Sequence, residues 1–273
     1  MAETVGSLAR RAAVAACLSL AWVSSVFAQA PEQPVVAPAP PAPDFLSRAD
    51  FHLSAASLSD NDIRFSWDTH FGGSVDIIDL VAARLGVAID YEAVLGSEFR
   101  RFDPNQGNYT LETYVNARLA PQTEAGIVFH HVSRHLSDRP KREAVDWNLL
   151  GGRILHHAQA GAGSLDLDLE AGRIVENSYV DYSWVGALRA LARRQLTARA
   201  GVYGRGEVEW FGVRPEIAGR GRQVGALFEA GVRLKGGGGQ MELFAGVERR
   251  VDADPLDRQP QTWALAGFRL LSR

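Results

Sequence analysis

The chain has 273 residues, a formal net charge of −3 and 46% hydrophobic residues. Its single cysteine, Cys17, lies in an apolar stretch near the N-terminus, so disulfides and thiolate metal sites are excluded from the rest of the chain. The sequence has neither basic clusters nor aromatic platforms, and we therefore expect no binding to nucleic acid.

Residues 1–28 have the pattern of a secretory signal peptide. Arg10 and Arg11 precede an apolar run over 12–23, which is shorter than the roughly 20 residues of a spanning helix, and small residues follow at the cleavage spacing. Residues 29–49 are rich in proline and are expected to form a disordered linker. We assign residues 50–273 to one domain exported to the bacterial outer membrane.

Alternation of apolar and charged residues dominates this domain. Over 195–211, one face carries residues such as Leu196, Val202 and Trp210, and the other carries arginines and glutamates. Strands of soluble proteins average about 5–6 residues, whereas this alternation is long, as in strands that face lipid on one side and a polar lumen on the other. The pattern predicts an all-β fold, a transmembrane antiparallel up-and-down β-barrel of about 12 strands, with 10 strands as the alternative.

Prolines and glycines divide the domain into strands joined by alternately short and long connections, as outer-membrane barrels require. Residues 51–58 are left over, as a periplasmic segment or an additional strand. The alternating C-terminal end resembles, in part, the closing strand that the barrel-assembly machinery recognises. The predicted strands lie near residues 62–71, 75–84, 87–96, 109–119, 124–134, 145–156, 164–174, 183–193, 195–211, 222–234, 240–250 and 262–271.

Three of the seven histidines lie at 130, 131 and 135, at the expected outer end of the fifth strand. A hairpin centred near Pro140 places Ser133 opposite Trp147, and Arg134 opposite Asp146 as a cross-strand ion pair. His131, Ser133 and His135 then share the lipid face. A base and a hydroxyl nucleophile on that face could hydrolyse an acyl ester.

The segment Phe129-x-His131-x-Ser133 resembles the lipid A 3-O-deacylases, a family of outer-membrane barrels with a lipid-facing His-x-Ser pair and a glutamate further along. The family's glutamate position corresponds to Val145, and the nearest carboxylates are Glu143 and Asp146. This resemblance implies a catalytic set of His131, Ser133 and Glu143. The stretch from His131 to Asp138 is also similar to a family of outer-membrane barrels known only as a domain of unknown function, which implies a barrel and no activity.

Two other interpretations of this stretch stay open: a polar rim near the lipid headgroups, and a metal or ligand site that would use His131 and His135. We expect no metal and no cofactor, because zinc sites usually need three or four ligands. In the lumen, Asp166, Asp168 and Glu170 are expected to balance arginines of the following strands at 189, 193, 199 and 205. The leading prediction is a structural barrel or small-solute pore, and the alternative is a lipid A deacylase-like esterase. The expected partners are outer-membrane lipids, lipopolysaccharide and the assembly machinery.

Overall fold

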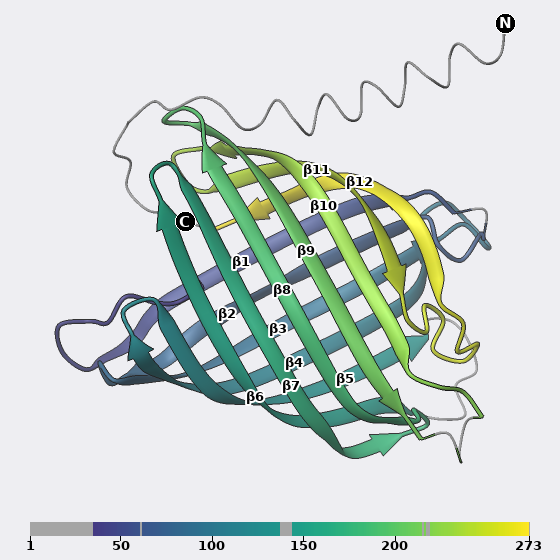
Figure 1. Cartoon of the computed structure of the whole chain (residues 1–273). Helices are drawn as coiled ribbons and strands as arrows, with labels where there is room; N and C mark the ends of the chain where they lie inside the picture. Colours follow the sequence, from purple (N-terminus) through teal and green to yellow (C-terminus); the bar gives the residue numbers. More distant parts are fainter. Residues whose placement is uncertain (1–34, 61, 137–143, 215, 217–218, 273) are drawn as a thin grey trace, which may run out of the picture.

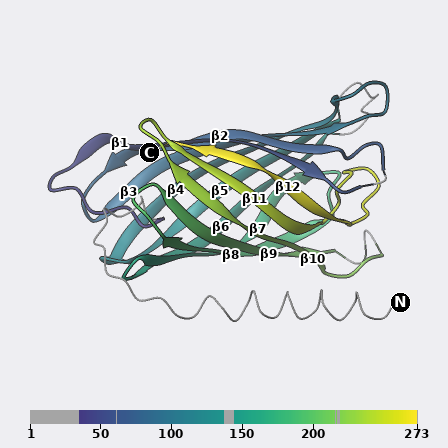
Figure 2. The ribbon, with the colours of Figure 1, turned by 90° about the horizontal axis from the view of Figure 1, so that it is seen from above.

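The computed structural model describes residues 35–60, 62–136, 144–214, 216 and 219–272. Twelve antiparallel strands form one closed barrel, in which each strand pairs with its neighbours in the chain and β1 pairs with β12 (Figures 1 and 2). This confirms the predicted fold class and excludes the ten-strand alternative. No helix among the described residues is long and apolar enough to cross a membrane. The strands are β1 Asp44–Leu58, β2 Trp67–Asp79, β3 Ala83–Gly96, β4 Asp103–Ala120, β5 Thr123–Leu136, β6 Val145–Ala160, β7 Gly163–Ser178, β8 Tyr182–Gln195, β9 Ala200–Val213, β10 Gln223–Lys235, β11 Gln240–Arg250 and β12 Gln261–Leu271.

The first two strands differ from the prediction, although the total is the same. Residues 51–58, which were left over, belong to β1, and the strands predicted at 62–71 and 75–84 are replaced by the single strand β2. The prediction left residues 72–74 between two strands, but Gly72 and Gly73 lie inside β2. A Cβ at either position would lie 2.3 Å from a carbonyl oxygen of a neighbouring strand, so these glycines permit close packing of backbones.

The N-terminal boundary of the barrel also differs from the prediction. β1 begins at Asp44, inside the segment assigned to the linker, and Val36 and Ala37 are buried. The part of the predicted linker before residue 35, and the predicted signal peptide, lie outside the described residues. The barrel therefore incorporates a part of the segment that the sequence suggested was disordered.

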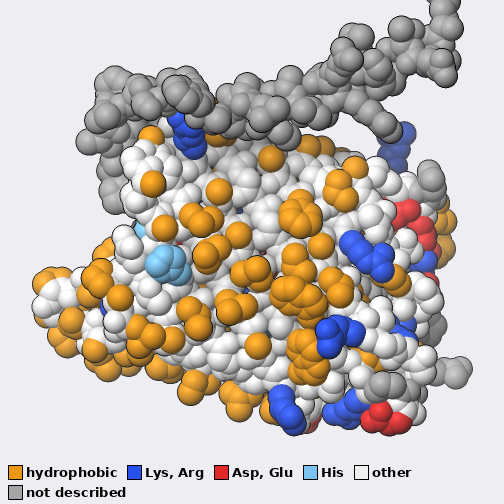
Figure 3. Space-filling view, in the orientation of Figure 1, with side chains coloured by type: hydrophobic (Ala, Val, Ile, Leu, Met, Phe, Trp, Pro, Cys, Tyr) orange, Lys and Arg blue, Asp and Glu red, His pale blue; other side chains and the backbone are white. Residues whose placement is uncertain are grey.

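The walls have apolar side chains outside and charged side chains inside. On β10, Phe228 is 59% exposed, while the next residue, Glu229, is 5% exposed. Figure 3 shows hydrophobic side chains spread over the middle of the visible wall, with charged groups gathered toward its margins. This arrangement inverts that of a soluble barrel and is the one expected of strands surrounded by lipid.

Ion pairs occupy much of the lumen, together with two clusters of buried apolar side chains, one around Phe65 and Trp263 and the other around Leu149 and Phe211. Arg233 contacts Glu242, and Arg269 donates to both Glu242 (2.6 Å) and Glu229 (2.8 Å). Arg193 pairs with Asp166, and Arg189 lies 3.4 Å from Asp168, so these two contacts of the predicted charge balance are confirmed. A cavity of about 500 Å³ remains in the lumen, and Arg189, Glu229 and Arg269 are among the residues that line it.

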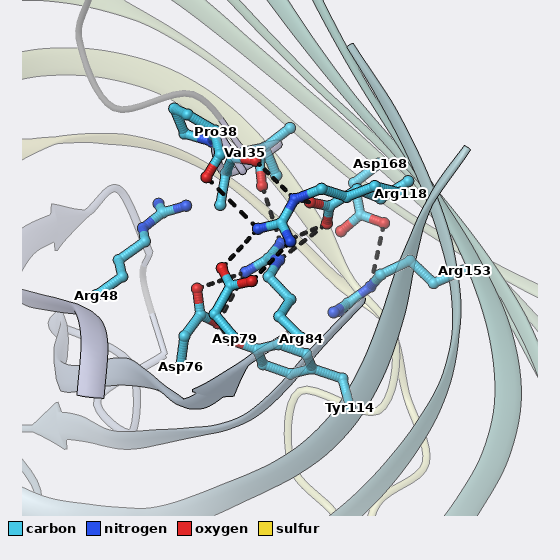
Figure 4. A network of polar contacts seen from close by, with 12 residues as sticks. Val35, Pro38, Arg48, Asp76, Asp79, Arg84, Tyr114, Arg118, Arg153 and Asp168 are labelled. Carbon is cyan, nitrogen blue, oxygen red and sulfur yellow. Dashed lines mark hydrogen bonds and ion pairs between the residues drawn. The ribbon is translucent and has the colours of Figure 1, made fainter. Parts of the chain in front are cut away.

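At the end of the barrel that carries the short turns, which is the predicted periplasmic end, the N-terminal segment lies against arginines of the lumen (Figure 4). Arg84 donates to the carbonyl oxygen of Val35 (3.2 Å), and Arg118 donates to those of Ala37 (3.3 Å) and Pro38 (3.5 Å). The Val35 amide donates to Asp166. Both arginines also pair with buried carboxylates, so the segment is held by a rigid polar network.

At the opposite end, the connection between β11 and β12 folds into the mouth of the barrel. Arg134 donates to the carbonyl oxygens of Asp252 (2.6 Å) and Ala253 (3.0 Å). Arg220 donates to Asp252 and Asp181 at 2.7 Å each. Burial would raise the pKa of the Asp181 carboxyl, but the hydrogen bonds from Arg220 outweigh burial and hold that pKa below its ordinary value. Described residues therefore occupy both ends of the lumen.

Candidate functional site

The histidine-rich end of β5 has the predicted orientation. Ile127 and Phe129 are exposed on the outer wall, and His131, Ser133 and His135 continue the same alternation on that face. Val128 is fully buried on the lumen side, and His130 and Arg134 follow it there. The two candidate residues His131 and Ser133 therefore lie on the surface that meets the membrane.

The register between β5 and β6 differs from the prediction by one residue. Ser133 pairs with Asp146, and His131 pairs with Asn148, because the hairpin is centred between two residues and not on Pro140. A shift of one residue moves every side chain of a strand to the other face. Asp146 and Asn148 therefore face outward, and Trp147 lines the lumen. Arg134 points into the lumen as predicted, but Asp146 faces outward, so the predicted ion pair between Arg134 and Asp146 is wrong.

A hydrogen-bonded chain crosses three strands on this outer face. His131 Nδ1 and Asn148 Oδ1 lie 2.7 Å apart, and Asn148 Nδ2 donates to Glu176 Oε2 on β7 at 2.9 Å. An ionised carboxylate only accepts hydrogen bonds, so the amide nitrogen of Asn148 faces Glu176 and its oxygen faces His131. Nδ1 of His131 then carries the proton, and Nε2 presents its lone pair as a base.

Ser133 has a histidine on either side along β5. Its hydroxyl lies 2.9 Å from Nε2 of His135, whose ring packs edge-on against Tyr109 at a centroid distance of 5.4 Å. His131 is two residues away on the same face, about 6–7 Å between Cα atoms. No hydrogen bond joins Ser133 to His131 in this structure. For His131 to act as the base, the side chain of Ser133 would have to rotate so that its hydroxyl leaves His135 and forms a hydrogen bond with His131.

β5 starts with Thr123 at the end of the barrel that carries the short turns, which is the predicted periplasmic end. At about 3.4 Å per residue and a tilt of about 40°, the chain rises about 25 Å from Thr123 to Ser133, the height of a typical apolar band. With the predicted orientation, and with Thr123 at the inner boundary of the membrane, we expect Ser133 to be level with the headgroup region of the outer leaflet.

The third predicted catalytic residue, Glu143, lies outside the described residues. Sequence reasoning missed Asn148 and Glu176, which the structure brings to His131. Their signal was weak but present: with the correct register, both are polar residues at outward positions near the outer ends of their strands, where lipid-facing side chains are ordinarily apolar.

Within the part of the chain that the structure describes, two groups in the lumen have the composition of a metal site: Asp68, His70 and Glu92 form one, and Glu112, His130 and Glu170 form the other. Arginines already occupy both. Arg153 donates to both oxygens of Glu112 (2.6 and 2.9 Å), and Arg250 contacts Asp68 and Glu92. Because the carboxylates are neutralised by guanidinium groups, these residues fit a bound cation poorly.

No known protein family matches the sequence, and no curated protein matches it. Among solved structures, the barrel is similar to outer membrane phospholipase A from Escherichia coli (TM-score 0.52, 13% identity, 84% of this chain and 98% of that chain). It is also similar to the calcium-bound dimer of the Salmonella typhi outer membrane phospholipase (TM-score 0.51, 13% identity, 82% and 90%). An active-site mutant of the E. coli enzyme, with alanine in place of an asparagine, matches as well (TM-score 0.50, 13% identity, 83% and 91%). At these identities the likeness shows the fold alone, and the two family resemblances of the histidine stretch remain predictions. This chain has the fold of a bacterial outer-membrane β-barrel.

Proposed function

We propose that this protein is a serine esterase that hydrolyses acyl esters of lipids in the outer leaflet of the outer membrane. The observation that carries the proposal is the hydrogen bond between His131 and Asn148, which orients an imidazole base on the outer wall two residues from Ser133. A nucleophile, a base and a third group that orients the base are the parts that serine catalysis needs.

In the proposed reaction, the Ser133 oxygen attacks the ester carbonyl carbon while its proton passes to Nε2 of His131. The ester C–O bond then breaks, and the imidazolium gives the proton to the departing alkoxide. Water, deprotonated by the same imidazole, then attacks the acyl-serine; the bond to the Ser133 oxygen breaks, the imidazolium returns the proton to that oxygen, and a fatty acid is released. Asn148 holds the ring in the tautomer that this proton transfer requires and interacts favourably with the imidazolium.

The position of the site supports a lipid substrate. Ile127 (64% exposed) and Phe129 (38% exposed) lie below it on the same face, where acyl chains of the membrane would lie alongside them. The alternatives of a pore and of a structural barrel receive less support. Described residues occupy both ends of the lumen, and the polar chain on the outer wall exceeds what a structural barrel needs.

The proposal implies lipids of the outer leaflet as the substrate class, either lipopolysaccharide or glycerophospholipid. The E. coli protein with the same fold is named a phospholipase, and its active site contains an asparagine. Partners of the barrel before insertion would be the assembly machinery of the outer membrane.

The test is mass spectrometry of lipid A and of phospholipids from cells that express the protein, with Ser133→Ala and His156→Ala as the variants. His156 contacts Thr123 at the periplasmic end of β5 and β6, so it is a matched histidine remote from the site. We expect the wild type and His156→Ala to remove acyl chains from one of the two lipid classes and Ser133→Ala to remove none. Unchanged lipids in wild-type cells, confirmed with the purified folded barrel in mixed micelles of each lipid, would refute the proposal. A current through planar bilayers without lipid hydrolysis would favour the pore.

A further inference from the structure

Glu176 is an exposed carboxylate on the wall that meets the membrane. Among the described residues, its hydrogen-bond partner is Asn148, and no arginine, lysine or histidine pairs with it. An ionisable group on a lipid-facing wall is costly to keep, more so toward the middle of the membrane than at its boundary. The presence of this carboxylate on the outer wall therefore needs a physical explanation.

A β-bulge brings Glu176 to this position. Leu149 pairs with Ile174 and the adjacent Asn148 pairs with Glu176, so Val175 is an extra residue in β7. In a regular ladder Val175 would stand opposite Asn148, and Glu176 would be displaced from this pair. Bulges often re-aim a side chain beside an active site, and this one aims a carboxylate at the amide of Asn148.

We propose that Glu176 is a positioning residue that acts through Asn148 on His131; this inference rests on the proposed esterase function. A side-chain amide can present either its oxygen or its nitrogen to the imidazole. If the nitrogen of Asn148 faced His131, Nδ1 would have to accept, the proton would reside on Nε2, and His131 could not take the proton of Ser133. Glu176 prevents this flip, because the flipped amide would direct its oxygen at a carboxylate.

The test exchanges the charge between the two positions. Asn148→Asp places a second carboxylate against Glu176, and we expect kcat to fall by about tenfold or more, since two like charges at hydrogen-bond distance repel strongly. Glu176→Gln alone keeps an acceptor but loses the charge. We expect it to lower kcat by about 3- to 10-fold with KM unchanged, the equivalent of one hydrogen bond.

The double variant Asn148→Asp/Glu176→Gln is decisive. The new carboxylate at position 148 accepts from Nδ1 of His131, and the new amide at position 176 donates to that carboxylate. We expect kcat to recover to above that of Asn148→Asp alone. Glu216→Gln, an exposed carboxylate in the connection between β9 and β10, is the matched control and should leave the rate unchanged.

Each outcome is interpretable when all variants show heat-modifiable gel mobility, which demonstrates a folded barrel. Recovery in the double variant supports the role of Glu176. A double variant whose loss equals the product of the two single losses would overturn the inference while leaving the esterase intact. A wild-type protein without Ser133-dependent hydrolysis would instead refute the proposed function itself.

Discussion

Alanine in place of His131 should remove nearly all ester hydrolysis, whereas alanine in place of His135 should preserve it. The structure makes this prediction informative, because the hydroxyl of Ser133 is hydrogen-bonded to His135, while the orienting chain of Asn148 and Glu176 supports His131. A general base contributes about 10²–10⁴-fold to a rate, and this is the loss that we expect for His131→Ala.

The magnitude expected for His135→Ala follows from the bond that it removes. A hydrogen bond contributes a net of about 0.5–1.5 kcal/mol, so the conformer in which Ser133 turns away from His135 is disfavoured about 2- to 13-fold. Removing His135 lifts this preference. We therefore expect a rate between that of the wild type and about tenfold above it.

The assay is fatty-acid release from the lipid that the expression experiment identifies, presented in mixed micelles to purified, folded protein. At least two orders of magnitude should separate the two histidine variants. If His135→Ala abolished hydrolysis and His131→Ala retained it, His135 would be the base, and the orienting role given to Asn148 would be wrong. Equal losses would show that the two histidines act in the same way, which also contradicts the assignment.

Three further predictions concern the ends of the lumen. Arg118→Ala removes the donors to the carbonyl oxygens of Ala37 and Pro38, so a protease added from the periplasmic side should cut the N-terminal segment faster, and equal cutting rates would contradict the contacts. Arg134→Met leaves the buried carbonyl oxygen of Asp252 without its donor, at about 1–3 kcal/mol, while Gln106 still donates to that of Ala253, and it should lower the temperature of the heat-induced gel shift; an unchanged temperature would show that the mouth does not depend on Arg134. Because the pKa of Asp181 is lowered, its pairing with Arg220 stabilises the mouth above the ordinary carboxyl pKa of about 3.9 and weakens only as pH falls through the lower folded value. Proteolysis of the β11–β12 connection should therefore stay slow from pH 7 to about pH 4 and accelerate below it, and acceleration near pH 6 would contradict this reasoning.

The fold was predictable because its signal is repeated along the chain. The alternation of apolar and charged residues recurs in strand after strand, so an error in one place, such as the break between the strands predicted at 62–71 and 75–84, leaves the class and the total unchanged. Glycine lowers the tendency to form a strand and also permits close backbone contact, and only the neighbouring strands show which of the two applies.

The site was only partly predictable, because it depends on the register between strands. The choice of His131 and Ser133 followed from their spacing within one strand, which needs no partner. Asn148 depends on whether a hairpin is centred on a residue or between two residues, and the loop sequence does not reveal this. The prediction of Glu176 depends in addition on the bulge at Val175, which cannot be recognised from the local sequence.

The seam of the barrel, where β1 meets β12, has a consequence for assembly. The paired register of the two strands runs over His52–Leu58, Phe51 and Ser59 add one backbone hydrogen bond at each end, and residues 44–50 of β1 extend past it. Closure is the one non-local step in a barrel otherwise made of successive hairpins, so the seam should form last and open first. The strands that carry His131, Asn148 and Glu176 are β5, β6 and β7, joined by adjacent hairpins far from that seam. The geometry of the site can thus be complete while the barrel is still open. A strand of another protein that paired temporarily with β1 or β12 at the seam during insertion would leave the site undisturbed.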